Sequence, residues 1–222
     1  MANWITLGRV PILLINILVL YRGSPALRLA GVGLLFIGLM LDTVDGMVAR
    51  ARGETSLFGS VLDIAIDRLY ESALWLCFAN LGFISVAIPL IVIARTTLTD
   101  AFRSIAVAQG TAPFAIHRTA LGRFLVGSTW MRVGYSVAKT LAFCGLALAQ
   151  ALADFPALVG GSVVGSMVEW LQIVAWIAVI VCVGRGAPVI MHSVRAIGSL
   201  SPSARYGPPR PEFSSASRSN DP

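Results

Sequence analysis

Six apolar stretches, each long enough to cross a lipid bilayer, restrict this chain to a narrow set of folds. A transmembrane helix needs about 17–25 mostly apolar residues. In this 222-residue chain we expect helices of that kind at residues 5–21, 26–48, 58–81, 84–108, 133–153 and 168–192. The predicted fold is therefore an all-α integral membrane protein with six transmembrane helices.

The composition supports a membrane protein. Only 13% of the residues are charged, whereas a soluble domain carries about 25%, and the mean hydropathy is +0.80. The net charge of +6 comes from arginine, because Lys139 is the single lysine. A basic balance can indicate nucleic-acid binding, but the apolar stretches leave no soluble basic domain to carry it. We expect membrane lipids, and no nucleic acid, as partners.

The arginines gather in alternate connections between the expected helices. Basic residues favour the cytoplasmic side of a membrane protein, and the turns near 82–84 and 154–167 contain no Lys or Arg. We therefore expect a multi-pass protein of the plasma membrane with both termini in the cytoplasm. Arg22 and Arg28 depart from this pattern and are expected at the outer interface. The arginines that define the pattern are Arg50, Arg52, Arg103, Arg118, Arg123, Arg132, Arg195, Arg205, Arg210 and Arg218.

The end of the chain differs in composition from the rest. Residues 199–222, "SLSPSARYGPPRPEFSSASRSNDP", are rich in proline and serine. Such a segment has too few apolar residues to build a core. We predict a membrane domain over residues 1–198 and a disordered cytoplasmic tail over residues 199–222.

Four aspartates lie in or beside the second and third apolar stretches. Asp42 and Asp45 are three residues apart, and Asp63 and Asp67 are four apart, so each pair shares one face of a helix. Between them, Gly53 and charged neighbours favour a tight turn. Two antiparallel helices joined there would bring the carboxylates into one polar pocket at the cytoplasmic side of the hairpin.

Carboxylates gathered in one pocket repel each other unless a cation neutralises them. A set of oxygen ligands favours a hard cation such as Mg²⁺, and a pair of such ions suits displacement at phosphorus. Gly46, Ala49 and Gly59 lie on the same faces and allow a helix or a flat ligand to approach closely. Arg50 is placed to hold a phosphate.

The aspartates could instead pair with Arg50, Arg52 and Arg68 and hold the helices together, or they could line a proton or cation transport pathway. Ion pairing alone does not require matched spacings on two consecutive helices. A transport pathway has less use for Arg50 and for the small residues beside it.

The same residues form a longer pattern, Asp42-x-x-Asp45-Gly46-x-x-Ala49-Arg50, then Gly59, Asp63 and Asp67 at intervals of four. This pattern resembles the signature of the CDP-alcohol phosphatidyltransferases at all eight positions. That family transfers a phosphatidyl group from CDP-diacylglycerol to an alcohol and releases CMP. The motif covers 26 residues, and the order of apolar stretches extends the resemblance over residues 1–195.

The resemblance implies a role for each motif residue. Asp42, Asp45, Asp63 and Asp67 would bind two divalent ions, Mg²⁺ or Mn²⁺, and Asp67 would also take the proton from the acceptor hydroxyl. The remaining residues would bind CDP-diacylglycerol, with small residues beside the cytidine and Arg50 on the pyrophosphate. The residues expected to bind this donor are Gly46, Ala49, Arg50, Ser56, Gly59, Asn3 and Thr6.

The stretches "ANWITLGRVPI", "IVIARTTLTDAFRSIA" and "AKT" resemble bacterial phosphatidylglycerophosphate synthases. That resemblance implies glycerol 3-phosphate as the acceptor, with Arg95, Arg103 and Lys139 around its phosphate. The chain departs from that group at Thr96, where an acidic residue is usual, and at Ser136-Val137, where Gly-Lys is usual. Inositol phosphate, phosphatidylglycerol and serine are alternative acceptors. The family also implies a homodimer.

Overall fold

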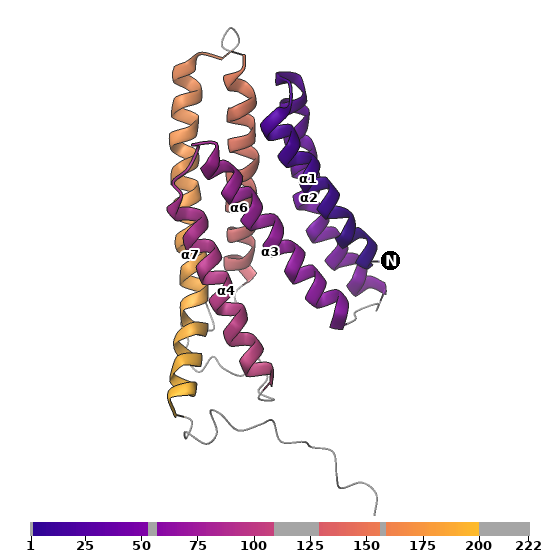
Figure 1. Ribbon diagram of the computed structural model, residues 1–222, viewed down its shortest axis with the longest axis vertical. Coiled ribbons are helices and arrows are strands. Elements are labelled where there is room, and N and C mark those ends of the chain that lie inside the picture. Colours follow the sequence, from indigo (N-terminus) through magenta and orange to yellow (C-terminus); the bar gives the residue numbers. More distant parts are fainter. Residues whose placement is uncertain (1, 53–56, 109–128, 156–158, 200–222) are drawn as a thin grey trace, which may run out of the picture.

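A computed structural model describes residues 2–52, 57–108, 129–155 and 159–199 (Figure 1). These residues form the helices α1 (Ala2–Arg22), α2 (Pro25–Arg52), α3 (Leu57–Asn80), α4 (Ala87–Ala108), α6 (Thr129–Ala153) and α7 (Gly161–Ser199). The described residues contain no strand. Within the helices, the side chains left undescribed are those of residues 2–6, 42–52, 57, 58, 60, 103, 105–108, 129, 130, 132, 189 and 192–199.

Each expected helix is present, which confirms the all-helical prediction. The largest difference is α7, which begins at Gly161 and continues to Ser199, beyond the expected range of 168–192 at both ends. Pro188 lies inside α7 and Pro11 inside α1 without ending either helix. The expected cytoplasmic tail from residue 199 lies outside the described residues, except for Ser199 itself.

Two helices in the described part of the chain are long and apolar enough to cross a membrane, over Val133–Ala153 and Gly161–Pro188. A shorter apolar stretch covers Pro25–Leu41 in α2. In contrast, α3 and α4 carry charged residues such as Asp67 and Arg95 within their apolar runs. Six membrane crossings therefore stay a prediction.

The outer surface of the bundle is strongly apolar. Large side chains that point outward include Leu18, Trp170 and Ile180, and each is more than half exposed. Single apolar residues are common on any protein surface, but here they recur on several helices of one bundle. A surface of this kind suits contact with lipid tails.

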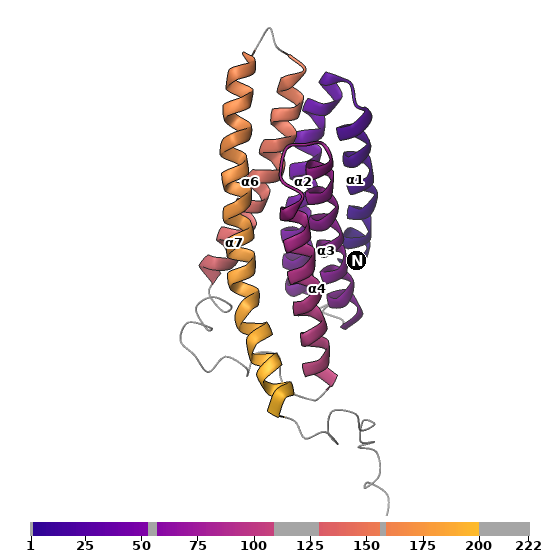
Figure 2. The ribbon, with the colours of Figure 1, turned by 60° about the vertical axis from the view of Figure 1, so that its left-hand side comes forward.

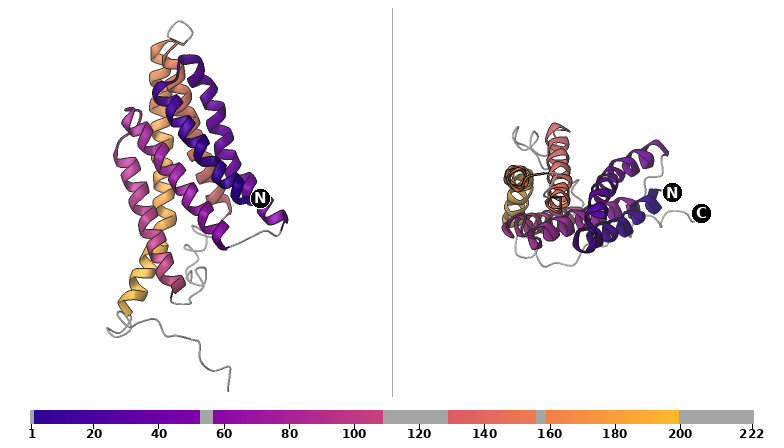
Figure 3. Two further views of the ribbon diagram at one scale, coloured as in Figure 1. Left: turned by 45° about the vertical axis from the view of Figure 1, so that its right-hand side comes forward. Right: turned by 90° about the horizontal axis from the view of Figure 1, so that it is seen from above.

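The bundle has two helix pairs joined by a central pair (Figures 1 and 2). α1 packs on α2, and α6 packs on α7, while α3 and α4 lie across them. α3 contacts α1 and α4, and α2 contacts α6. Figure 3 shows from above that the α1–α2 pair and the α6–α7 pair lie on opposite sides.

The core lies where α3 meets α6. The rings of Trp75 and Phe143 are 4.5 Å apart, and those of Phe78 and Phe143 are 6.1 Å apart. All three side chains are fully buried. Aromatic pairs at these separations stabilise a core beyond the area that they bury, so this cluster fixes α3 against α6.

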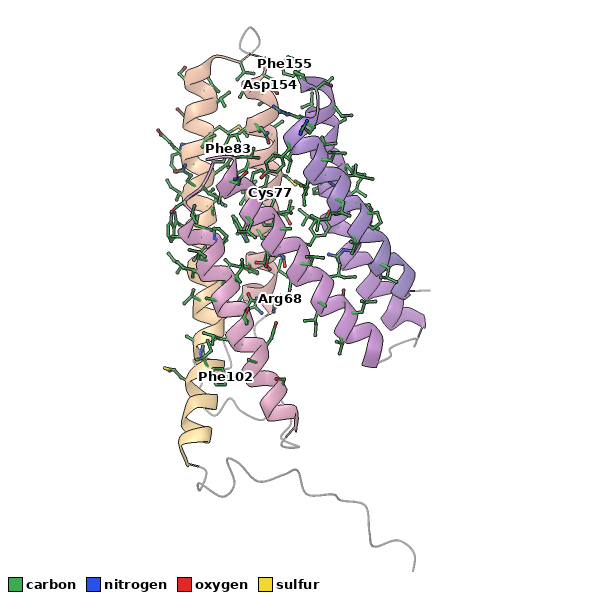
Figure 4. All side chains as sticks on the ribbon, viewed as in Figure 1. Arg68, Cys77, Phe83, Phe102, Asp154 and Phe155 are labelled. Atoms are coloured by element: carbon green, nitrogen blue, oxygen red, sulfur yellow. The ribbon has the colours of Figure 1, made fainter. Side chains whose placement is uncertain are left out.

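The helices alternate in direction, so the start of α1 and the end of α7 lie at the same end of the bundle (Figure 1). The ends of α2 and α4 lie there too. At the opposite end, Gly82 has a φ of 81° in the turn that leads to α4, a conformation that glycine adopts without strain. Arg28 and Asp154 also pair at that end, with Nη1 2.8 Å from Oδ2 (Figure 4).

Candidate active site

Asp63 and Asp67 lie one turn apart on α3, as their spacing predicts. Their side chains are 45% and 33% exposed, so both carboxylates keep access to the surface of the bundle. Asp42 and Asp45 belong to α2, but their side chains lie outside the described ones, as do those of Gly46, Ala49 and Arg50. The meeting of all four carboxylates therefore stays a prediction.

One contact brings α2 close to α3 beside these positions. The hydroxyl of Tyr70 occupies the space that a β-carbon would take at Gly38. Gly38 lies one turn before Asp42, and Tyr70 lies three residues after Asp67. A close approach one turn away on both helices favours the expected convergence of the two aspartate pairs.

Asp63 is paired with an arginine that lies outside the aspartate motif. Nη1 of Arg9, on α1, lies 3.7 Å from Oδ1 of Asp63. The Arg9 side chain is only 1% exposed, and its guanidinium carbon lies 5.5 Å from the centre of the Tyr70 ring. Arg9 was not among the expected site residues. An arginine inside an apolar stretch is itself a signal of function or pairing, and this signal could have identified it.

Asp67 is paired across the bundle with Lys139 of α6. The Nζ atom of Lys139 lies 3.4 Å from Oδ1 of Asp67 and 3.5 Å from Oε2 of Glu71. Glu71 lies one turn after Asp67 and is buried. The structure thus brings together the expected base and one expected acceptor residue, and it adds Glu71, which lies outside the motif.

A third cation, Arg68, links this group to α4. Its Nε atom lies 3.4 Å from Oδ2 of Asp100, and its Nη1 atom lies 3.9 Å from Oε2 of Glu71. In Figure 4, Asp154 lies at one end of the bundle, and Cys77 and then Arg68 follow toward the other end. Arg68 is therefore the nearest of the three to the end of the bundle where α4 ends. The sequence made Arg68 a possible partner of the motif aspartates, but its described ion pairs are with Asp100 and Glu71.

Asp63 and Asp67 both form ion pairs with residues of other helices. Such pairs are what the alternative hypothesis, in which the aspartates only hold the helices together, predicts. Both pairs are loose, however, because charge-assisted bonds between nitrogen and oxygen are usually about 2.7–2.9 Å long. Both carboxylates are also partly exposed to the surface of the bundle. The pairs are therefore compatible with a site that binds a cation.

Arg95, another expected acceptor residue, lies between α4 and α7. Its side chain fills the space that a β-carbon would take at Gly186. Its Nε atom is buried and has no hydrogen-bond partner among the described atoms. The side chain of Arg103 lies outside the described ones, as do Ser56 and the side chains of Asn3 and Thr6. Gly59 lies in α3, partly buried.

The oxygen atoms of Asp63 and Asp67 suit Mg²⁺ or Mn²⁺. No group of three or more His, Cys, Asp or Glu side chains among the described residues is placed to hold a metal. The two described carboxylates therefore fit half of the expected ligand set, and the other half lies on the part of α2 whose side chains are undescribed. Two bound ions remain a prediction.

The helices that carry this site match a known protein family. The family profile described as CDP-alcohol phosphatidyltransferase matches residues 1–153, from α1 to the end of α6. The chain belongs to this family. The match confirms the resemblance that the aspartate pattern indicates. The matched range contains both Asp67 and Lys139, which form an ion pair between α3 and α6.

Curated relatives in this family have more than one activity in their names. An archaetidylinositol phosphate synthase of Pyrococcus horikoshii is 33% identical over 88 residues, which cover 40% of this chain and 46% of the relative. A CDP-diacylglycerol–glycerol-3-phosphate 3-phosphatidyltransferase of Rickettsia bellii is 26% identical over 103 residues, covering 46% and 57%. The inner membrane protein YnbA of Escherichia coli is 31% identical over 100 residues, covering 45% and 50%. The chain spans about half the length of these relatives.

Proposed function

We propose that the chain transfers a phosphatidyl group from CDP-diacylglycerol to a phosphorylated alcohol and releases CMP. Membership of the CDP-alcohol phosphatidyltransferase family supports the reaction class. The names of two relatives, from Pyrococcus and Rickettsia, each include a phosphate-bearing product or acceptor. Glycerol 3-phosphate is the acceptor that we propose first, and inositol phosphate is the main alternative.

The strongest structural support is the meeting of Asp67 and Lys139, whose Oδ1 and Nζ atoms are 3.4 Å apart. A base for the acceptor hydroxyl and a cation for the acceptor phosphate must lie within the length of one small molecule. Asp67 on α3 and Lys139 on α6 meet this requirement. Arg95, between α4 and α7, adds a second cation on the side of the bundle where α7 packs.

The chemistry assigned to the chain is a displacement at phosphorus. Asp67 accepts the proton of the acceptor hydroxyl. The acceptor oxygen forms a bond to the phosphorus of the phosphatidyl group, the bond from that phosphorus to CMP breaks, and CMP leaves with the electron pair. Bound Mg²⁺ or Mn²⁺ would neutralise the pyrophosphate and make CMP a better leaving group.

The donor would lie on the side of α2. We propose that Arg50 holds the pyrophosphate and that Gly46, Ala49 and Gly59 make room for the cytidine. Ser56, Asn3 and Thr6 are proposed as additional donor contacts. The close approach of Gly38 to Tyr70 supports this arrangement, because it brings α2 and α3 together one turn away.

We propose that the protein lies in the cell membrane, with the site and both termini in the cytoplasm. The apolar outer surface, the two long apolar helices and the inner membrane relative support this location. The positions of the helix ends support the topology, since α2, α4 and α7 all end at the same end of the bundle (Figure 1). A homodimer and a separate tail from residue 199 are also part of the proposal.

The proposal can be tested with purified protein in lipid, CDP-diacylglycerol and Mg²⁺. CMP release is measured with glycerol 3-phosphate, inositol phosphate, inositol, serine and phosphatidylglycerol in separate reactions. We expect release with a phosphorylated alcohol and none with free inositol or serine. Release with serine alone would overturn the acceptor class. No release with any acceptor would overturn the reaction and favour a transport role for the aspartates.

A further inference from the structure

Glu71 is a buried acid that the motif does not explain. It lies on α3 one turn after Asp67, and its side chain is only 3% exposed. A buried carboxylate is unfavourable unless cations and hydrogen-bond donors surround it. The partners that satisfy Glu71 therefore indicate what it does.

Those partners come from two helices and surround both oxygen atoms. The hydroxyl of Tyr135, on α6, donates a hydrogen bond to Oε1. On the other side, Oε2 lies 3.5 Å from Nζ of Lys139 and 3.9 Å from Nη1 of Arg68. A carboxylate held from both sides has a fixed position, and Glu71 is such a group.

Lys139 is shared between this fixed acid and the expected base. Its Nζ atom is almost equally far from Asp67 and from Glu71, at 3.4 and 3.5 Å. Lysine has a flexible side chain whose compact charge has no directional preference of its own. Tyr135 lies one turn before Lys139 on α6, so both face α3, and the Lys139 Nζ atom lies 5.6 Å from the Tyr135 ring centre.

We propose that Glu71 is a positioning residue that keeps Lys139 beside Asp67 for the acceptor phosphate. The proposal rests on the proposed function. An incoming phosphate attracts Lys139 and draws it off Asp67, and Asp67 is then available to the acceptor hydroxyl. Glu71 keeps the Lys139 side chain at the site while its Nζ atom moves from Asp67 to the phosphate. Glu71 can do so because Tyr135 fixes the position of the Glu71 carboxylate.

A purely structural role is the alternative. In that case Glu71 would only join α3 to α6, and its loss would lower stability and affect both substrates alike. A positioning role predicts a selective effect on the acceptor. The two roles therefore differ in how the two KM values respond.

The kinetic test uses Glu71→Gln, which keeps the size of the side chain and removes its charge. We expect the KM for the acceptor to rise about tenfold, the effect of losing one charge-assisted bond. The KM for CDP-diacylglycerol should stay unchanged. Glu71→Asp, which restores the charge one methylene farther away, should have an intermediate acceptor KM. Equal increases in both KM values would overturn the proposal.

Gln150→Leu provides a matched control on α6. Gln150 is buried, and its Nε2 atom donates to the carbonyl of Leu20, 2.8 Å away. Its replacement by leucine removes a buried polar contact between α6 and α1. This contact lies about three helical turns from Lys139 along α6. We expect lower thermal stability in this variant with an unchanged acceptor KM. A raised acceptor KM in this variant would assign the Glu71 effect to general loosening of the bundle.

A second measurement does not depend on activity. Because Lys139 is the only lysine, protein made with ¹³C-lysine gives a single set of side-chain NMR signals. We expect two separate signals for the Cε protons of the immobilised wild-type lysine, and one averaged signal in Glu71→Gln. Tyr135→Phe, which removes the hydrogen bond to Glu71, should move the signals in the same direction and replaces Glu71→Gln if that variant does not fold.

The two measurements separate the two hypotheses. A wild-type protein that releases no CMP with any acceptor overturns the proposed function, while the lysine signals still report the position of Lys139. Unchanged lysine signals in Glu71→Gln and Tyr135→Phe overturn the positioning role, whether or not the enzyme is active.

Discussion

Arg9 of α1 and Asp63 of α3 form an ion pair inside the helix bundle, with Nη1 3.7 Å from Oδ1. The same arginine lies over the ring of Tyr70, whose hydroxyl reaches α2 at Gly38. Three helices therefore meet at one contact beside the motif aspartates of α3. The position of Asp63 depends on residues outside the aspartate motif.

This relationship predicts that Arg9 and Asp63 are energetically coupled. In a double-mutant cycle of Arg9→Met and Asp63→Asn, we expect a coupling free energy of about 1 kcal/mol, within the range for residues in contact. The value is modest because Asp63 is 45% exposed and remains hydrated. Reversible unfolding in detergent measures it. Additive effects of the two substitutions would contradict an interaction between them.

Arg22→Met is the control for the Arg9 substitution. Arg22 is an exposed residue in the last turn of the same helix, and exposed substitutions usually change stability by less than about 0.5 kcal/mol. We expect its unfolding free energy to match that of the wild type. An equal loss in both variants would mean that any arginine on α1 stabilises the protein to the same extent.

The close approach of α2 and α3 predicts that Gly38→Ala is destabilising. Alanine normally favours a helix relative to glycine, but a β-carbon at Gly38 would collide with the Tyr70 hydroxyl. Overpacking of this kind costs about 1–3 kcal/mol. Gly33→Ala, at an open position on the same helix, should be neutral or stabilising. In the double variant, we expect Tyr70→Phe to restore part of the stability lost in Gly38→Ala. Thermal unfolding compares the wild type, the two glycine variants and the double variant.

The packing of Arg95 on α7 predicts a selective effect of Gly186→Ala. A β-carbon at Gly186 would displace the Arg95 side chain, so we expect a severalfold rise in the acceptor KM without a matching rise for the donor. Gly184→Ala is the control, because a β-carbon there meets open space on the same helix. Steady-state kinetics of CMP release distinguish the two variants. Indistinguishable KM values would exclude Arg95 from the acceptor site.

The carboxylates of α3 predict dependence on a divalent metal. Treatment with EDTA should abolish CMP release, and Mg²⁺ or Mn²⁺ should restore it, because oxygen ligands favour these ions. Ca²⁺ serves as a control that binds oxygen ligands with a looser geometry, and we expect little recovery with it. Full activity after removal of divalent ions would contradict a metal site at Asp63 and Asp67.

Much of the fold follows from hydropathy. The apolar stretches predict every helix in the described part of the chain, because each stretch is long enough to span a bilayer and is bounded by polar or glycine-containing sequence. The start of α7 was not predicted, since the glycines and serines at residues 161–166 suit a loop as well as a close contact between helices. They continue the helix because Val164 and Leu171 are buried against its neighbours.

The candidate site was predictable only in part. The spacing of Asp63 and Asp67 places both on one face of α3, which the structure confirms. The pairing of Asp67 with Lys139, however, joins residues far apart in sequence and depends on how α6 packs. Helical periodicity carries no information on such contacts. For this reason Glu71 and Arg9 were not predicted, although a charged residue in an apolar stretch is a signal in itself.

CMP release by Asp67→Asn, under saturating CDP-diacylglycerol, acceptor and Mg²⁺, tests whether this carboxylate is the base. The asparagine amide has nearly the same shape as the carboxylate, but it cannot take the proton from the hydroxyl of the acceptor alcohol at neutral pH. We predict a fall in kcat of at least about 100-fold, the lower end of general-base contributions, in a protein with the helical content of the wild type. A folded Asp67→Asn variant that releases CMP at the wild-type rate would contradict the assignment of this site.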